Sequence, residues 1–304
     1  TRLCEPFIAF DSITGDIFRL SNYGTYYNDQ DDYGGQDAFF QNTQLLCWRS
    51  SDGGHSFSFP QDLTTLYLQQ FNDARPLISC SHLISCKDGC IRIPCGVYAP
   101  GMPSWHCRVM TGKVIGDDIN WSWGEVIPAV ANRNLFMSEF TIAEVPSGLL
   151  AIVRAADNED KNSCRKYYTI STDGGLHWNP TQELRYTDGS TFYCSDSCGY
   201  LLRHSNGRLW YISNIFEQDV EPIYARTSLS IVEIDDKTLA PKKKTLTRID
   251  GLENGDNPEL AISNFSCYED RQTGEIVLES PKAFQYHSTL NDINLMEYRI
   301  KIAK

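Results

Sequence analysis

Five hairpin-like segments recur along this chain at a spacing of about sixty residues. In each, two short runs rich in Val, Ile, Leu, Phe and Tyr flank a turn such as PSG or SNG. The turn glycines Gly15, Gly89, Gly148, Gly207 and Gly274 are separated by 74, 59, 59 and 67 residues (89 − 15, 148 − 89, 207 − 148, 274 − 207). Helical periodicity is nearly absent. The repeat therefore predicts one all-β domain over residues 1–304, a β-propeller of four-stranded blades. Five blades are visible as repeats, and strands from both chain ends could complete a sixth.

A second repeat follows two of these hairpins. SSDGGHSF at 50–57 and STDGGLHW at 171–178 share Ser, Asp, Gly and an aromatic residue at the same four places, and GDDINWSW at 116–123 is a worn version. An Asp carboxylate in such a turn accepts bonds from nearby backbone N–H groups, and glycine supplies a positive φ. We interpret the motif as a structural turn between the third and fourth strands of a blade, with no catalytic role for Asp52 or Asp173.

Composition excludes some classes of partner. The 304 residues carry a net charge of −12 and a sequence pI near 4.9, which argues against nucleic-acid binding. The one basic run, Lys242 to Lys244, is interpreted as a solvated edge or loop. No apolar stretch is long enough to span a membrane, and no signal peptide is visible. The chain starts at Thr1, which fits either a removed leader or a trimmed chain, and we favour a secreted or extracellular protein over a cytoplasmic one.

Eleven cysteines leave at least one unpaired. A hairpin at KDG places Cys86 near Cys90 and Cys80 near Cys95, which predicts disulfides in an exported protein and free thiols otherwise. Zinc is a third interpretation, although the spacing lacks paired CxxC motifs. The same alternatives hold for Cys194 with Cys198. We expect no metal site and no cofactor.

The two intact turns match the pattern S-x-D-x-G-x-x-[WF] at every defined position. In this the chain resembles the sialidase-like β-propeller superfamily, the proteins with bacterial-neuraminidase (BNR) repeats or Asp boxes. The resemblance is clearest from Ser138 to Trp178 and extends more weakly from about residue 6 to the end. It supports the fold more than it supports activity, since non-catalytic propellers also carry Asp boxes. Sialidases have six blades.

The resemblance implies candidate site residues. Asp37, shortly before the first Asp box, occupies a place similar to that of the family's acid/base Asp, and Asp29, Asp31 and Asp32 compete for the role. Glu139 in SEFTIAEV matches the Glu that begins a strand of the family's middle blade. Sialidases bind a substrate carboxylate through three arginines. Arg165 resembles the second of these and Arg226 the third, and Arg154 in AIVRA is a further candidate for the pocket.

Two departures from the family bear on mechanism. The family's Arg-Ile-Pro element belongs in the first blade, whereas Arg92 to Pro94 lies in the second hairpin and is interpreted as coincidence; Arg2 or Arg19 could substitute. The family's Tyr before a Ser is replaced by Ile262 before Ser263, and Tyr268 lies too near a turn to replace it with confidence. Losing that Tyr would remove the retaining sialidase mechanism, which depends on a covalent intermediate.

Three functions fit these residues. The leading hypothesis is an exo-acting glycoside hydrolase that works on an anionic or terminal sugar of a glycan, with Asp37 as proton donor and Glu139 as general base or supporting carboxylate. The rival is a non-catalytic glycan- or protein-binding propeller. The third is a polysaccharide lyase, for which His82, His106 and His204 are available. Trp105, Trp210 and Tyr224 are candidates to stack on a sugar ring. The oligomeric state is left open.

Overall fold

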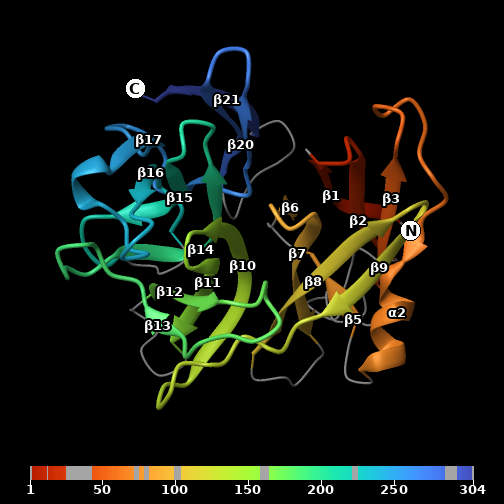
Figure 1. Ribbon diagram of the computed structural model, residues 1–304. Coiled ribbons are helices and arrows are strands. Elements are labelled where there is room, and N and C mark those ends of the chain that lie inside the picture. The colour runs from red at the N-terminus through yellow and green to blue at the C-terminus, as the bar shows by residue number, and fades with distance from the viewer. Residues whose placement is uncertain are drawn as a thin grey trace, which may run out of the picture. The chain divides into compact units, whose positions relative to one another are not determined.

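The chain forms five β-sheets that follow one another along the sequence (Figure 1). The computed structural model describes residues 2–11, 13–24, 43–71, 75–78, 82–98, 104–157, 164–220, 225–284 and 293–302. The five sheets correspond to the five predicted hairpin repeats, and they confirm the predicted all-β fold class of a β-propeller. Each predicted turn glycine adopts a positive φ, from 70° at Gly274 to 138° at Gly148.

The first two sheets lie in one compact unit, Thr1–Pro128 with Phe136–Phe140 and Ser171–Asn179. The first sheet has the order β1-β2-β3-β4, with β1 Arg2–Phe10, β2 Ile17–Gly24, β3 Gln44–Ser50 and β4 Gln61–Asp62. Helix α2, Leu63–Gln70, follows at once because the Asp62 side chain caps it, accepting from the N–H groups of Thr64 and Thr65.

The second sheet has the order β5-β7-β8-β9, and β6 pairs with β7 beside β5. Its strands are β5 Arg75–Leu77, β6 Ile84–Ser85, β7 Cys90–Tyr98, β8 His106–Ile115 and β9 Asp118–Trp123. The worn Asp box therefore differs from the intact ones. Gly116 and Asp117 form a tight two-residue hairpin, because Ile115 pairs directly with Asp118, and the rest of the motif is strand.

The second compact unit comprises Ala129–Leu135, Thr141–Ile170 and Pro180–Lys304. The third sheet, most of which belongs to this unit, has the order β10-β11-β12-β13. Its strands are β10 Leu135–Val145, β11 Gly148–Asp157, β12 Cys164–Ser171 and β13 Gln182–Glu183. The fourth sheet has the order β14-β15-β16-β17, with β14 Tyr193–Arg203, β15 Leu209–Phe216, β16 Ser228–Ile234 and β17 Thr247–Gly251. A 3-10 turn, η1 Lys243–Thr245, precedes β17.

The fifth sheet contains β18 Leu260–Ile262, β19 Ser266–Asp270, β20 Glu275–Phe284 and β21 Asn294–Lys301. Strands β18 and β19 follow one another along one edge of β20, and β21 pairs along the other edge. Apolar side chains fill the space between the third and fourth sheets, with Leu150 and Tyr211 among the most buried, and another apolar cluster joins the fourth sheet to the fifth.

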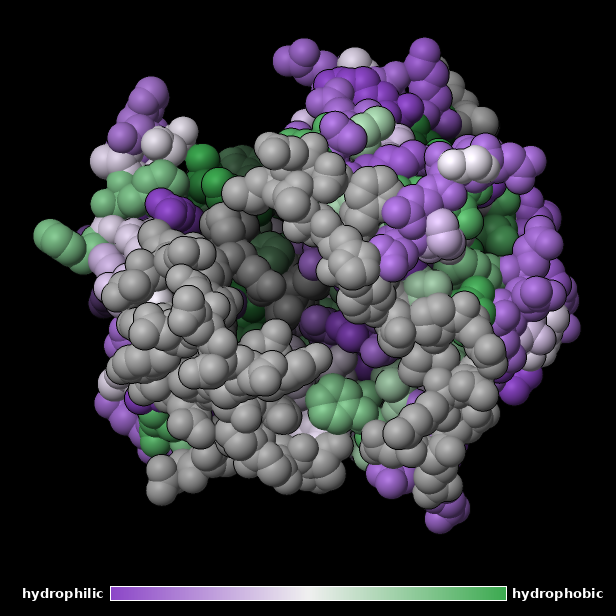
Figure 2. All heavy atoms as spheres, turned by 180° about the vertical axis from the view of Figure 1, so that it is seen from behind, coloured by the Kyte–Doolittle hydropathy of each residue, from purple (hydrophilic) through white to green (hydrophobic). Residues whose placement is uncertain are grey.

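Figure 2 shows the hydropathy of the described residues on one face of the molecule. Hydrophilic side chains make up most of the described surface along one edge of the face drawn in Figure 2, and hydrophobic ones are scattered among them. No helix within the described ranges has both the length and the apolar character to cross a lipid bilayer.

Both intact Asp boxes are structural turns. In the first, the Ser50 hydroxyl donates to Asp52 over 2.8 Å and accepts from the N–H of Gly54 over 2.9 Å. In the second, Ser171 makes the same two bonds, to Asp173 and from Gly175, over 2.8 and 2.7 Å. Hydrogen bonds from the N–H and ring of His177 lower the pKa of Asp173 to about 2. These bonds use both carboxylates within their own turns.

Arg92 has a structural partner as well. Its guanidinium is buried, hydrogen-bonds Asp88, and donates from Nε to the carbonyl of Gly174 over 2.7 Å. Arg92 thus anchors the second Asp box within the first unit.

Candidate functional site

The predicted site residues fall in different parts of the chain. Asp37, Asp29, Asp31 and Asp32 lie outside the described residues, as does Tyr224. Glu139 lies on β10 in the first unit and is half-buried. The hydroxyl of Ser138 donates to its Oε2 over 3.3 Å. Burial, reinforced by the negative charge of Glu139, raises the pKa of the Cys107 thiol. Glu139 is thus a partly buried carboxylate. Its catalytic role stays a prediction.

In the second unit, β14, the first strand of its sheet, carries a long bulge. Cys194 pairs with Ile215 and Gly199 pairs with Ser213, so the four residues Ser195–Cys198 face the single residue Asn214 on β15. A bulge of this kind re-aims side chains that a regular strand would alternate between its two faces. Here it carries Asp196.

A buried lysine holds the bulge in place. Lys166, on β12, has no exposed surface, and its Nζ donates to the carbonyls of Ser195, over 3.2 Å, and Ser197. These carbonyls flank Asp196 on both sides. The hydroxyl of Ser213 donates to the carbonyl of Cys198 over 3.0 Å and fixes the far end of the bulge. Because both carbonyls lack strand partners, the ammonium supplies donors that the β-ladder does not.

Asp196 forms a two-bond ion pair with Arg154. The guanidinium donates from Nε to Oδ1 over 2.7 Å and from Nη2 to Oδ2 over 3.0 Å, and each side chain is 21% exposed. Burial alone would raise the pKa of Asp196. The hydrogen bonds and charge of Arg154, helped by Lys166 and Arg226, outweigh burial and lower that pKa. Asp196 is therefore ionised at neutral pH and is the charge partner of Arg154.

Arg226 has hydrogen-bonding capacity to spare. Its Nη1 donates to Oδ1 of Asn264 over 3.2 Å. Its Nε is buried and finds no hydrogen-bond partner among the described residues. Asn264 adopts φ 57°, a left-handed conformation that asparagine tolerates, and it follows the short strand β18. A buried guanidinium N–H without a partner marks a place where a ligand oxygen would be stabilised.

Arg165 is engaged differently. It makes two bonds to Asp219, one of them 3.1 Å long, and its guanidinium lies 5.0 Å from the centre of the Tyr193 ring. The structure thus brings Arg154 and Arg226 together around Asp196, and leaves Arg165 in a separate pair beside the start of the bulge. Since Arg154 and Arg165 each already bind a protein carboxylate, a three-arginine carboxylate site stays a prediction.

Sequence reasoning missed Asp196 and Lys166. In YCSDSCGY, residues 193–200, Cys194 and Cys198 draw attention to disulfides or metal, and no local pattern predicts a bulge at Asp196. Lys166 directly follows Arg165 in strand β12. From the sequence, a lysine next to an arginine is expected to face solvent, so nothing indicated that Lys166 is buried.

The other candidates lie in structural settings. Trp210 is buried beneath the guanidinium of Arg208, 4.6 Å from its ring centre, and His204 is buried in the β14–β15 turn, where Nε2 lies 3.1 Å from the carbonyl of Gly274. His82, His106 and Trp105 are partly buried in the first unit. Ile262, at the place of the family's Tyr, is fully buried in the core, and Tyr268 is 48% exposed on β19.

The cysteines and acidic residues offer no metal centre within the described ranges, where no group of three or more His, Cys, Asp or Glu side chains converges. The nine described cysteines outside β1 are free thiols, including Cys86, Cys90, Cys95, Cys194 and Cys198.

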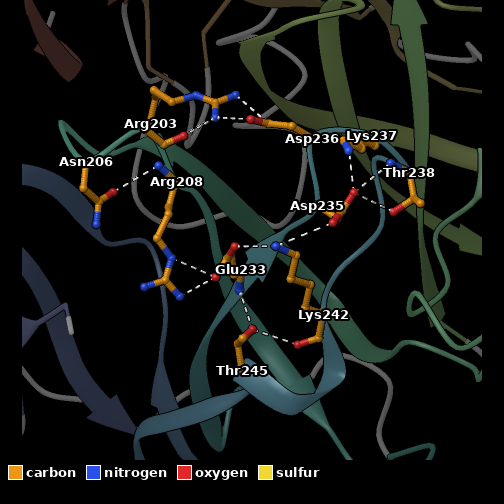
Figure 3. Close-up of polar contacts among 11 residues, drawn as sticks. Arg203, Asn206, Arg208, Glu233, Asp235, Asp236, Lys237, Thr238, Lys242 and Thr245 are labelled. Atoms are coloured by element: carbon orange, nitrogen blue, oxygen red, sulfur yellow. Dashed lines mark hydrogen bonds and ion pairs between the residues drawn. The ribbon is translucent and has the colours of Figure 1, made fainter. Parts of the chain in front are cut away.

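A second charged cluster lies at the opposite end of the fourth sheet (Figure 3). Glu233 on β16 accepts from Nε of Arg208 over 2.8 Å and from Nζ of Lys242 over 2.6 Å. Lys242 also lies 3.5 Å from Asp235, and Arg203 pairs with Asp236 through two bonds of 2.8 Å. This cluster contains three basic and three acidic side chains, so its charges balance.

Solved structures support the fold. An intramolecular trans-sialidase from Ruminococcus gnavus superposes with a TM-score of 0.59 at 14% identity, covering 98% of this chain and 78% of that one. An α-L-arabinanase from Penicillium chrysogenum, complexed with arabinobiose, gives 0.58 at 13% identity, covering 97% and 76%. The Hadza microbial sialidase Hz136 gives 0.57 at 14% identity, covering 97% of this chain, which spans about half (52%) of that protein. At such identities the likeness shows the fold alone.

Comparison of sequences gives the family. None of the curated proteins matches the chain. The family model for the BNR repeat-like domain matches residues 31–270. Because this segment makes up well over half of the 304 residues, the protein belongs to the family of BNR repeat-like domains.

Proposed function

We propose that this protein is a glycoside hydrolase that removes a terminal, anionic sugar from a glycan. The observation that carries the proposal is the buried Nε of Arg226, which has no partner among the described residues and lies beside the Arg154–Asp196 pair. A donor of this kind suits a carboxylate or a ring hydroxyl of a bound sugar.

The charges around Asp196 support an anionic ligand. Among the described residues, Arg154, Lys166 and Arg226 all act on Asp196, so three positive charges are set against this one carboxylate. The nearby Arg165–Asp219 pair is neutral and does not change this excess. Such a field raises the local concentration of anions. The structural neighbours include enzymes titled sialidase and arabinanase, and the excess positive charge favours an acidic sugar over a neutral one.

In this proposal, Asp37 donates a proton to the leaving oxygen and Glu139 serves as general base on water, as the sequence resemblance implies. Arg226 binds the acidic group of the sugar. Arg154 keeps Asp196 ionised and oriented, so that it accepts from a sugar hydroxyl or stabilises positive charge that develops at the anomeric carbon.

The rival function is a glycan-binding propeller without turnover. It is favoured by the buried Ile262, which leaves the described part of the last sheet without the family's Tyr. The proton-donor and base scheme above requires no such Tyr, because water attacks directly.

The test is an assay of the full chain against sialyl-lactose and against aryl glycosides of uronic acids and of neutral pentoses. We expect turnover of one acidic substrate and none of the arabinosides. Turnover of neutral substrates alone would contradict the anionic specificity. Binding of acidic sugars without turnover of any substrate would replace the hydrolase by the binding propeller.

A further inference from the structure

Two buried thiols from neighbouring sheets lie against each other in the second unit. Cys164 begins β12 and Cys194 lies near the start of β14, thirty positions later. Sγ of Cys194 lies 3.6 Å from the carbonyl oxygen of Cys164, and the two thiols are within hydrogen-bonding reach of each other. The side chains are only 2% and 3% exposed.

The residues on either side keep the two strands in this register. Next to Cys164, Arg165 places its guanidinium over the ring of Tyr193. One residue further, Lys166 donates to the carbonyl of Ser195. Successive contacts from 164–166 to 193–195 therefore hold the two cysteines beside each other, as a disulfide requires.

The local charges favour reaction at one of the two sulfurs. Burial would raise the pKa of Cys194, but the hydrogen bond from Cys164 and the positive charges of Lys166 and Arg165 lower it. The pKa of Cys164 is raised, first by that hydrogen bond and then by burial. Cys194 is thus the more readily ionised of the two thiols, the asymmetry that reactive cysteine pairs use.

We propose that Cys164 and Cys194 are a reversible oxidation site, at which hydrogen peroxide converts the two thiols to a disulfide that joins the third and fourth sheets. The Cys194 thiolate attacks one peroxide oxygen, the O–O bond breaks, and the hydroxide that leaves takes up a proton to become water. The sulfur of Cys164 then displaces the oxygen of the resulting sulfenic acid as a second water. Two electrons pass from the thiols to the peroxide, and a dithiol reductant returns them.

The oxidation acts on the candidate site through Cys194. The S–S bond is about 2 Å long, shorter than any contact between the thiols, so bridging draws Cys194 toward β12. Cys194 directly precedes the bulge that carries Asp196. The modification itself is independent of the proposed hydrolase activity.

The experiment is disulfide mapping of the native chain, with and without peroxide, after alkylation and digestion under non-reducing conditions. We expect one crosslinked peptide pair containing Cys164 and Cys194, which dithiothreitol converts back to two alkylated peptides. The variant Cys164→Ser should instead trap sulfenic acid at Cys194, detected by dimedone labelling. Cys198→Ser is the matched control, since it alters a buried thiol in the same bulge, and it should leave the crosslink intact.

Peroxide treatment that leaves both cysteines fully alkylated would overturn the proposal, as would a crosslink between other cysteines in the native protein. A crosslink that forms only after unfolding in urea would also count against it. Mapping reads the bond itself, so these outcomes are distinct from a failure of the glycosidase assay.

Discussion

The two ends of the fourth sheet both gather charge, but they do so in different ways. At the Glu233 end, three acidic and three basic side chains pair off (Figure 3). At the Asp196 end, three basic side chains act on one carboxylate, one of them is completely buried, and another has a donor without a partner among the described residues.

From this difference we infer that the Glu233 cluster stabilises the fold and that the Asp196 cluster is the one available to a ligand. At the Glu233 end the carboxylates of Glu233 and Asp236 each accept at least two bonds from cations, and the donors are 28% to 34% exposed, as in an ordinary surface network. At the Asp196 end, the ammonium of Lys166 donates to two carbonyls of the bulge. These carbonyls are neutral, so they do not cancel the positive charge of Lys166. Excess charge held at a structural cost suggests use in binding.

The largest expected effect comes from removing the lysine at each end. Lys166→Met should destabilise the protein by about 3 kcal/mol, since two buried carbonyls lose a charged donor. Lys242→Met, on the exposed cluster, should cost about 1 kcal/mol or less. Urea unfolding of both variants measures the difference. Equal costs would mean that Lys166 does not hold the bulge.

The fold was predictable because its signals are local. A glycine with positive φ, such as Gly207 in SNG, is required by the turn itself, and the Ser171–Asp173 turn closes within eight residues. The prediction was less accurate for the degenerate motif at 116–123. There a tight hairpin at Gly116 replaces the Asp-box turn, and most of the motif's residues lie in strand β9.

The site was predictable only in part. Arg154 and Arg226 are candidates because of the family resemblance, but their relation to Asp196 arises from a bulge whose register depends on β15. The pairing of Arg165 with Asp219 joins positions 54 apart, and no local pattern encodes it. Tertiary contacts of this kind decide which arginine side chains remain available to bind a ligand.

The second effect concerns binding. Arg226→Ala should weaken binding of an acidic monosaccharide ten- to a hundredfold, about 1.4 to 2.8 kcal/mol, because the ligand loses its guanidinium donor. Arg208→Ala, the matched change at the balanced end, should leave binding unchanged. Isothermal titration calorimetry compares the two. If Arg208→Ala weakened binding as much as Arg226→Ala, the ligand would not depend on the unbalanced cluster.

Acid should affect both ends in the same direction. At Glu233, burial would raise the pKa, but bonds from Arg208 and Lys242 lower it, and the pKa of Asp196 is lowered too. A depressed pKa in the folded state stabilises the protein above the unfolded pKa, about 4.3 for Glu and 3.9 for Asp. That contribution is lost as the pH falls below these values, through the folded pKa of each group.

Urea midpoints measured from neutral pH down to about pH 2.5 should therefore fall more steeply below about pH 4 in the parent protein than in Asp196→Asn or Glu233→Gln. The two variants should each have a flatter profile, and their effects should add because the groups lie at opposite ends of the sheet. A variant whose profile runs parallel to the parent's would show that its carboxylate is not held ionised by its partners.

The smallest effect tests whether Arg165 belongs to the unbalanced cluster. Its partner Asp219 is 47% exposed, and Asp219→Asn should cost at most about 1 kcal/mol of stability while it frees the guanidinium. With Arg165 released, one more positive charge faces the ligand, and binding of an acidic sugar should tighten up to about fivefold at low salt. Asp236→Asn releases Arg203 in the same way at the balanced end, and it should leave affinity unchanged. If the two variants bind alike, Arg165 only anchors the start of the bulge, and the ligand is held by Arg154 and Arg226 without a third arginine.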